Sequence, residues 1–202
     1  MTALLILIAS GVLMVDARLR TSLGAYVVFS AATLSLIYPD AVKTPDGLMI
    51  FVVLTLIKIV AGPVLIMQLV RRAHLREYLS PAFPVSVRLA VVVLAVFLGY
   101  GVGHMVAFVG IPDANLVFYC LFASMCIVML HRSLLAHVIG LLTLGSAISL
   151  AGAVFAPSLP GAIDLAGTFD AILATIVAIS VARALARHDP KLDIRSLREL
   201  RG

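Results

Sequence analysis

The segment GLMIFVVLTLIKIVAGPVLIMQLV, residues 47–70, is long and apolar enough to cross a lipid bilayer as a single helix. At a rise of about 1.5 Å per residue, roughly 20 apolar residues span the ~30 Å hydrocarbon core. One charged residue, Lys58, interrupts the segment, and Arg71 and Arg72 follow it directly. The segment therefore predicts a membrane protein and singles out Lys58 as a candidate functional residue.

Six further apolar segments accompany this one, separated by short polar breaks or by breaks that contain proline and glycine. The first and fifth are short for a bilayer, so their ends are the least well defined. We predict an all-α fold, a polytopic membrane helix bundle of about seven transmembrane helices. The predicted segments are 1–15, 22–38, 47–70, 87–110, 114–130, 133–156 and 162–187.

The composition agrees with this prediction. Hydrophobic residues make up 62% of the 202 residues and charged residues 12%, whereas soluble chains are near half apolar and a quarter charged. A soluble core does not need so many apolar side chains, but a surface that faces the lipid bilayer does. The net charge of +5 does not imply nucleic acid as a partner, because the positive residues follow a topological pattern.

Lys and Arg residues concentrate in alternate breaks, as the positive-inside rule requires. Lys43 alone lies in one of the opposite breaks, and Lys58 lies within a predicted span. This alternation predicts a multi-pass protein of the prokaryotic cytoplasmic (inner) membrane, with its N-terminus outside and its C-terminus in the cytoplasm. The residues expected on the cytoplasmic side are Arg18, Arg20, Arg71, Arg72, Arg76, Arg88, Arg132, Arg183, Arg187, Lys191, Arg195, Arg198 and Arg201.

Lys58 is the first candidate for an ion or proton pathway. A charged group in the hydrocarbon core costs ~2.5–3.5 kcal/mol even on the most lenient scale, so such groups are commonly functional. Gly62 and Pro63 follow four and five residues later, and Pro63 withholds its N–H from the carbonyl of Ile59 in a regular helix. We expect a helix kink here that opens backbone polar groups beside the lysine.

Asp170 is the second candidate. It lies thirteen residues before Arg183, as Lys58 lies thirteen before Arg71, so both are expected about 20 Å from the inner rim. We predict that the two groups pair directly or share a hydrated cavity. Two interpretations stay open: a lysine–carboxylate relay, in which a proton at one group shifts the pKa of the other, and an ion pair that only sets helix packing.

Two further titratable residues are weaker candidates. Asp164, at the outer edge of the last predicted span, is either part of the pathway or a solvated acid at headgroup level. His137 lies one turn into the sixth predicted span and titrates near neutral pH, but a single membrane histidine is more often a packing or hydrogen-bonding residue. The glycines of GYGVGH, residues 99–104, are expected to form a close helix–helix contact and not a phosphate-binding loop.

The sequence contains no pattern typical of a metal site, a cofactor site or a catalytic centre. Cys120 and Cys126 are six residues apart on one apolar segment, where they cannot form a disulfide and are expected to pack as small apolar residues. No CxxC, Cys/His cluster, nucleotide-binding glycine loop, HExxH or catalytic-triad pattern occurs. We expect that the chain is not an enzyme by itself and holds neither a metal nor a cofactor.

The segment LIKIVAGPVLIMQLVRR, residues 56–72, resembles the Lys-then-Pro helix of hydrogenase-4 component E proteins. Residues 131–202, with HRSLLAHVIG, PGAIDLAGTFDAILATIVAISVAR and KLDIRSLRELRG, resemble the C-terminal half of that family. The last three predicted helices and the tail are also similar to the K-type subunit of complex I and the C-type subunit of multisubunit Na⁺/H⁺ antiporters. The resemblance implies an N-terminal four-helix membrane region (1–110), a K-type-subunit-like three-helix region (111–188) and a basic cytoplasmic tail (189–202).

The resemblance implies a small membrane subunit of a complex I-like energy-converting assembly, of the group 4 nickel–iron hydrogenase or formate hydrogenlyase type. Its partners would be large antiporter-like membrane subunits, other complex I-like membrane subunits and a peripheral redox module. In such a family, acidic residues of the last two helices are proposed to serve proton or ion passage. Asp164 falls where relatives have Glu, Asp170 falls on a matching Asp, and Lys58 matches the lysine of the third helix.

One position departs from the family pattern. Where relatives read Met-Glu-Asn-Gly in the penultimate helix, this chain reads Leu-Gly-Ser-Ala at 144–147. The acidic position of the family is therefore lost at Gly145, and no other acid occurs between Arg132 and Asp164. Either the pathway is shorter and more hydrated in this chain, or the chain has become purely structural.

Two other functions stay open. The chain could be an ion or solute transporter subunit, or a stand-alone carrier, without a redox partner. The basic, helix-prone tail after Pro190 favours a subunit, because such a tail can dock on a cytoplasmic partner. A membrane-embedded enzyme is disfavoured by the lack of a nucleophile–base pair. The sequence does not identify the ion, H⁺ or Na⁺, or the redox partner and its substrate.

Overall fold

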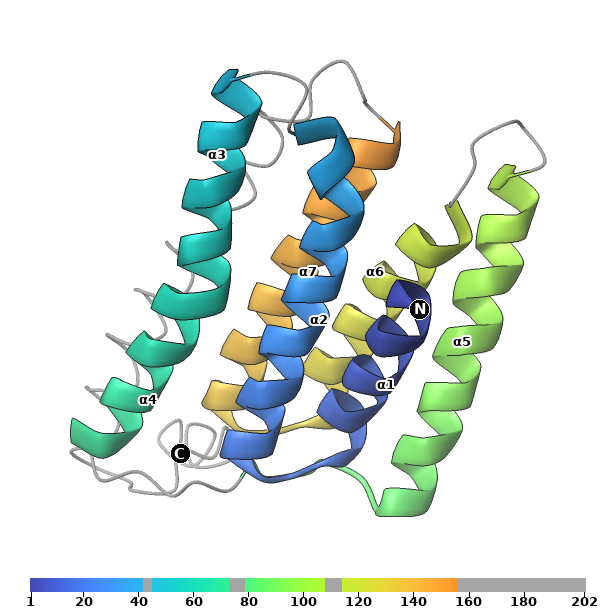
Figure 1. Ribbon diagram of the computed structural model, residues 1–202. Helices are drawn as coiled ribbons and strands as arrows, with labels where there is room; N and C mark the ends of the chain where they lie inside the picture. The colour runs from blue at the N-terminus through green and yellow to red at the C-terminus, as the bar shows by residue number, and fades with distance from the viewer. Residues whose placement is uncertain (42–44, 73–78, 108–113, 156–202) are drawn as a thin grey trace, which may run out of the picture.

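The computed structural model describes residues 1–41, 45–72, 79–107 and 114–155, which form a bundle of helices (Figure 1). Within these ranges the chain forms no strand, apart from one isolated bridge between Pro81 and His131. The predicted all-α fold is confirmed. The elements are α1 (Thr2–Val15), α2 (Leu19–Ala41), α3 (Pro45–Thr55), the π-helix η1 (Leu56–Ala61), α4 (Gly62–Arg72), α5 (Val85–Ala107), α6 (Ala114–Leu130) and α7 (Leu134–Phe155).

Four described helical segments are long and apolar enough to cross a membrane, namely Leu19–Pro39, Phe51–Gln68, Val85–Val106 and Leu134–Phe155. These segments match four of the predicted spans and are compatible with a membrane protein. α1 and α6 are apolar but shorter, as expected for the first and fifth predicted segments. The last predicted span, 162–187, lies outside the described residues, so the count of seven helices and the orientation of the termini stay predictions.

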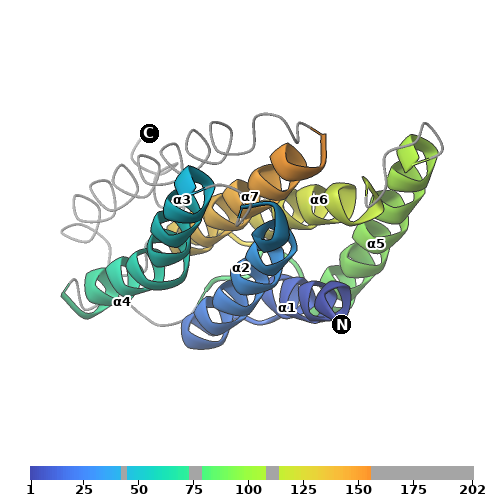
Figure 2. The same ribbon diagram turned by 45° about the horizontal axis from the view of Figure 1, so that its top comes forward.

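The described helices form a bundle with a central pair and two flanking rods. α2 and α7 pack against each other in the middle, α1 packs on α2 and α6, and α6 packs on α7. α5 lies along one flank and packs mainly on α6, whereas the continuous α3–η1–α4 rod lies along the other flank (Figure 1, Figure 2). The central pair is therefore the part of the bundle where a buried site can form.

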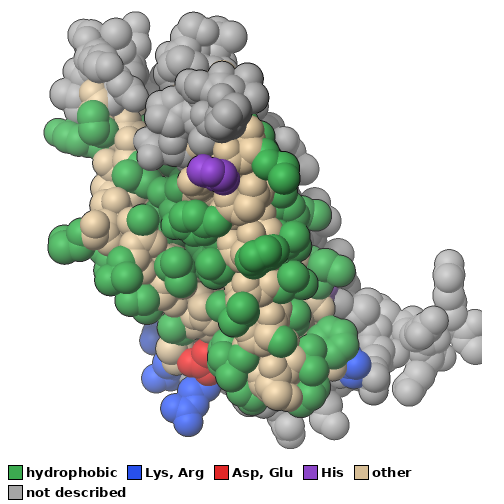
Figure 3. Space-filling model, turned by 90° about the vertical axis from the view of Figure 1, so that its right-hand side faces the viewer, with side chains coloured by type: hydrophobic (Ala, Val, Ile, Leu, Met, Phe, Trp, Pro, Cys, Tyr) green, Lys and Arg blue, Asp and Glu red, His purple; other side chains and the backbone are tan. Residues whose placement is uncertain are grey.

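The flanking rods expose large hydrophobic side chains. On α5, Val93 is 69% and Phe97 is 75% exposed, and Leu56 on the opposite rod is 62% exposed. Figure 3 shows that hydrophobic side chains are spread over most of the α5 side of the molecule, whereas Lys, Arg and acidic side chains gather at one end. A soluble protein rarely exposes so large an apolar surface, but a surface in contact with lipid or with other membrane helices requires it.

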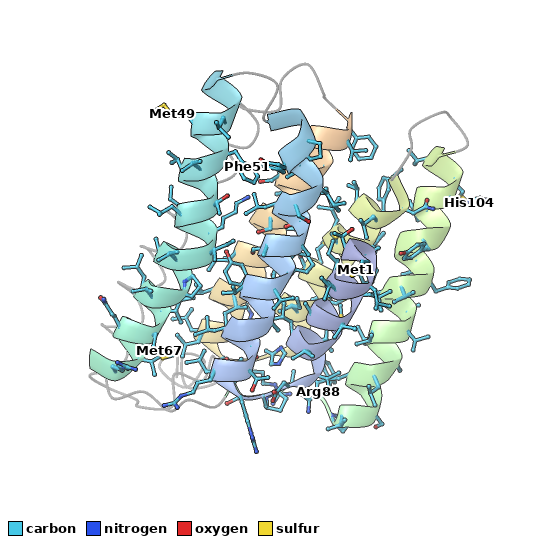
Figure 4. The ribbon with its side chains drawn as sticks, in the orientation of Figure 1. Met1, Met49, Phe51, Met67, Arg88 and His104 are labelled. Atoms are coloured by element: carbon cyan, nitrogen blue, oxygen red, sulfur yellow. The ribbon has the colours of Figure 1, made fainter. Side chains whose placement is uncertain are left out.

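The loops at one end of the bundle are joined to each other. We call this end the basic end, and it comprises the turns 16–18 and 131–133 and the segment 79–84. The distribution of Lys and Arg predicts that these loops lie on the cytoplasmic side. Arg88, labelled in Figure 4, lies at this end and donates a hydrogen bond to the carbonyl of Val15. Backbone hydrogen bonds of 2.7 to 2.9 Å connect the three loops, from Leu79 to Ala17, from Ala82 to Leu130 and from Arg132 to Ser80.

α5 and α6 pack through glycines of the GYGVGH segment. A Cβ atom at Gly99 would lie 2.4 Å from Cα of Tyr119, and a Cβ atom at Gly103 would lie 2.2 Å from Cα of Asn115. The two backbones thus approach too closely for any larger residue at these positions. The expected close helix–helix contact is confirmed for Gly99 and Gly103, whereas Gly101 faces open space.

Candidate functional site

Lys58 lies on η1, a π-helical turn between α3 and α4. The N–H of Gly62 donates to the carbonyl of Ile57, five residues earlier, instead of four as in an α-helix. Pro63 explains the wider turn, because in a regular α-helix its ring would clash with the carbonyl of Ile59. The distortion expected at Gly62 and Pro63 therefore takes the form of a wide turn that contains Lys58 itself.

The Lys58 side chain is directed into the protein. Only 4% of the residue is exposed, and its Nζ donates a hydrogen bond to Ser149 Oγ on α7 at 2.5 Å. Ser149 Oγ donates in turn to the carbonyl of Gly145, one turn earlier on α7, at 3.0 Å. Lys58 lies midway in sequence between Met49 and Met67, which mark the two ends of its rod in Figure 4, so this contact is at mid-height of the bundle.

Gly145 lies on the face of α7 that Lys58 approaches. It is buried, and it shares a helix face with Ser149 because residues four apart on an α-helix lie above one another. A carboxylate at position 145 would therefore lie close to the Lys58 ammonium. In this chain the Ser149 hydroxyl, which is bonded to the Gly145 carbonyl, occupies the surroundings of the Lys58 ammonium.

A second buried pair of hydroxyls extends this polar region to α2. Ser30 Oγ and Ser146 Oγ are 3.1 Å apart, and Ser146 lies three residues before Ser149 on α7. The Tyr26 hydroxyl lies near the same two hydroxyls, but outside the geometry of a hydrogen bond to any residue that the structure describes. These residues were not predicted from the sequence. For the residues on α2, the signal that could have found them is the recurrence of hydroxyl side chains at four-residue intervals, at 22, 26 and 30.

The other predicted pathway residues do not join this region in the part of the chain that is described. His137 lies in the first turn of α7, half-buried, with Nδ1 2.9 Å from a backbone carbonyl of the preceding turn. It is twelve residues from Ser149, about 18 Å along the helix. Asp164 and Asp170 lie outside the described residues, so the pairing of Asp170 with Lys58 stays a prediction.

A separate buried hydroxyl pair connects α1 with α6. Tyr119 Oη and Ser10 Oγ lie 2.5 Å apart, and Ser10 also donates to the carbonyl of Ile6 at 2.7 Å. Since the single hydroxyl hydrogen of Ser10 is used in that way, Tyr119 is the donor between the two hydroxyls. The pair was not predicted, and its complete hydrogen bonding is typical of a contact that holds two helices together.

The described residues contain no group of three His, Cys, Asp or Glu side chains that could hold a metal ion. Cys120 and Cys126 on α6 are free thiols. No protein-family model matches this chain, and neither does any curated protein or solved structure. The resemblance to hydrogenase-4 component E therefore stays a prediction, and the function has to be inferred from the surroundings of Lys58.

The Lys58 site is suited to binding and releasing a proton. In its ammonium form, Lys58 donates to Ser149. A neutral amine could accept a hydrogen bond from the same hydroxyl, because a hydroxyl group both donates and accepts. Ser149 can therefore be a hydrogen-bond partner of both protonation states of the lysine by rotation of its hydroxyl group.

Proposed function

We propose that this chain is a small, non-catalytic membrane subunit of a complex I-like energy-converting assembly, of the group 4 nickel–iron hydrogenase or formate hydrogenlyase type. It supports proton or Na⁺ translocation and the assembly of large antiporter-like subunits, in contact with a peripheral redox module. It crosses the prokaryotic cytoplasmic membrane several times, with its C-terminus in the cytoplasm. The observation that supports the ion-translocation role is the burial of Lys58 on a π-helical turn against Ser149. The assembly is proposed from the sequence resemblance of residues 56–72 and 131–202.

A buried lysine contributes little to the stability of an apolar bundle. Replacing buried ionic groups with apolar ones of similar size is often neutral or stabilising, so a helix needed only for packing would gain nothing from Lys58. Charged residues inside membrane segments commonly mark ion or proton pathways, and π-helical turns recur at functional sites. These two features coincide at Lys58 and support a role in ion movement.

A stand-alone ion carrier without a redox partner is the second candidate. One observation favours it: α2, η1 and α7 of a single chain supply both the Ser30–Ser146 contact and the Lys58–Ser149 contact. The two candidates share this polar region and differ in their partners.

Purification of the intact complex separates the two candidates. The full chain with an affinity tag, extracted in mild detergent, should retain large antiporter-like subunits and a redox module that mass spectrometry identifies. A monodisperse monomer that moves ions alone in vesicles would contradict the subunit role and support the carrier. Lys58→Met should abolish ion movement in either case, whereas Leu56→Met, at an exposed position of the same turn, should leave it unchanged.

Gly145→Glu provides a second test of the site. The substitution restores a carboxylate one turn from Ser149, where it can pair with Lys58. We expect faster ion movement if Lys58 belongs to a pathway that has lost its acidic partner at this position. Unchanged movement in a correctly folded variant would show that the pathway does not use this part of α7.

A further inference from the structure

α2 carries hydroxyl side chains along one side. Ser22, Tyr26, Ser30 and Thr33 are each at most 1% exposed. Their spacings of four, four and three residues keep them within one sector of the helix. From Ser22 to Thr33 the series extends over about 16 Å. We call Ser22, Tyr26 and Ser30 the hydroxyl stripe, because Thr33 differs from them in its hydrogen bonding.

The stripe is incompletely hydrogen-bonded. Thr33 Oγ1 donates to backbone carbonyls of its own helix at 2.9 and 3.1 Å, and Ser30 meets Ser146. Ser22 Oγ and Tyr26 Oη, by contrast, are buried without a hydrogen-bond partner among the described residues. A buried hydroxyl without a partner costs free energy, and in folded proteins such groups are usually satisfied by internal water.

The stripe leads from the basic end to Lys58. Ser22 lies about 5 Å from the start of α2 at the basic end, and Tyr26 is one turn further along. The Tyr26 hydroxyl lies 4.0 Å from the position that a Cβ atom of Gly62 would occupy, directly after η1. Ser30 then meets Ser146 on α7, and Ser146 is about one turn from Ser149, the residue that binds Lys58.

We propose that the hydroxyl stripe, together with Ser146 and Ser149, is a water-assisted proton path between the basic end and Lys58. This inference rests on the proposed function and deepens it by naming the proton as the ion. When a proton moves from the basic end to Lys58, the neutral Lys58 amine takes the proton of the Ser149 hydroxyl and becomes an ammonium. Ser149 regains a proton through water and the remaining hydroxyls, and one proton leaves the solvent at the basic end.

A sodium ion does not suit this path. It would have to exchange its water shell for several oxygen ligands, and the described part of the path offers scattered single hydroxyls. Lys58 would also repel it whenever the lysine is in its ammonium form, because the surroundings have a low dielectric constant. A proton can pass along the same hydroxyls by the making and breaking of O–H bonds.

Radiolytic hydroxyl-radical labelling of the full chain tests for water in the path. Radicals formed from bound water oxidise the nearest side chains, and this chain contains a matched pair of tyrosines. Tyr26 and Tyr119 are both 0% exposed, but the Tyr119 hydroxyl is satisfied by Ser10. We expect Tyr26 to be labelled at least tenfold faster than Tyr119. Equal rates would overturn the proposal.

Hydrogen exchange at Lys58 tests for proton transfer. The chain has three lysines, so ¹⁵N-lysine labelling gives few Nζ signals to assign. Tyr26→Phe and Ser146→Ala should each slow exchange at Lys58 Nζ several-fold, whereas Thr33→Val, which removes a hydroxyl outside the path, should not. Equal effects of all three variants would overturn the path, and a Lys58 signal that shifts on addition of sodium chloride, but not of potassium chloride, would overturn the proton assignment.

These measurements use the purified chain and need neither a redox module nor an antiporter-like partner. A failed co-purification would therefore remove the proposed subunit role and leave the path testable. Conversely, a dry stripe would remove the path while the chain could still be a structural subunit of the assembly.

Discussion

The two inter-helical contacts described above differ in chemistry. Between α5 and α6, the glycines of GYGVGH let the two backbones touch, so that the contact consists of van der Waals packing. Inside the bundle, by contrast, hydroxyls and a lysine meet: Ser30 on α2 contacts Ser146 on α7, and Lys58 on the α3–η1–α4 rod contacts Ser149 on α7. The α5–α6 contact has no polar side-chain pair at the glycines, whereas the contacts inside the bundle are built from such pairs.

This difference predicts different consequences of substitution in the two contacts. A close backbone contact has a single good arrangement, because interiors are densely packed and any added atom displaces others. A hydroxyl contact can rearrange by rotation about one bond and can admit water. We therefore expect substitutions in the glycine contact to reduce stability most, and substitutions in the polar contact to reduce it less and to change ion movement as well.

The largest effect is expected for Gly99→Ala. The new methyl group would lie 2.4 Å from Cα of Tyr119, and a backbone atom cannot move aside as a flexible side chain can. We predict a loss of about 3 kcal/mol in the free energy of unfolding, measured by denaturant titration in detergent. Gly101→Ala is the matched control, since it faces open space and should be neutral or stabilising by up to ~1 kcal/mol. Similar losses for both variants would contradict the close contact.

The next largest effect is expected for Ser149→Ala. This variant removes the hydroxyl that accepts the Lys58 hydrogen bond, and we predict a loss of about 2 kcal/mol in the free energy of unfolding. Lys58→Met removes the charge together with the need to solvate it, so it should cost less than about 1 kcal/mol or stabilise the protein. The double variant should recover most of the loss. If Lys58→Met is as costly as Ser149→Ala, the lysine is a structural element.

A smaller effect is expected for the Ser30–Ser146 contact. A double-mutant cycle with Ser30→Ala and Ser146→Ala should give a coupling free energy of about 0.6 kcal/mol, the average for hydrogen bonds between membrane helices. The control cycle combines Ser30→Ala with Thr143→Val, because the Thr143 hydroxyl is bonded to its own helix. A coupling near zero in both cycles would show that the two serines do not interact.

The smallest effect is expected for the pH dependence of stability, which we attribute to His131 at the basic end. Burial lowers the pKa of the His131 imidazole below its ordinary value, and the charge of Arg88 adds to this shift. Below pH ~6.5 the unfolded chain therefore binds a proton more readily than the folded one, and the free energy of unfolding falls until the pH passes the lowered pKa. Thermal unfolding between about pH 8 and pH 5 should show this fall, and His131→Gln should reduce it. Parallel curves for the two proteins would contradict the prediction.

Much of the fold could be predicted from the sequence, whereas little of the polar region could. An apolar segment in lipid has to satisfy its backbone hydrogen bonds within itself, so hydropathy is enough to predict a helix. Lys58 was found for a similar reason, since a charge in such a segment is rare. Ser149 was missed because a serine among apolar residues is common and usually bonds to its own helix, as Ser124 does here.

The sequence by itself determined where the described helices run and which charge lies inside them, because both follow from local composition. It also indicated the distortion after Lys58, since proline disturbs a helix wherever it occurs. Only the tertiary structure decided that the distortion is a π-helical turn and that Lys58 meets Ser149, 91 residues away. Apart from the hydroxyls of α2, these helices are apolar on nearly every face, so hydropathy does not indicate which face turns inward. That choice depends on how the helices pack together, through glycines on one side and hydroxyls on the other.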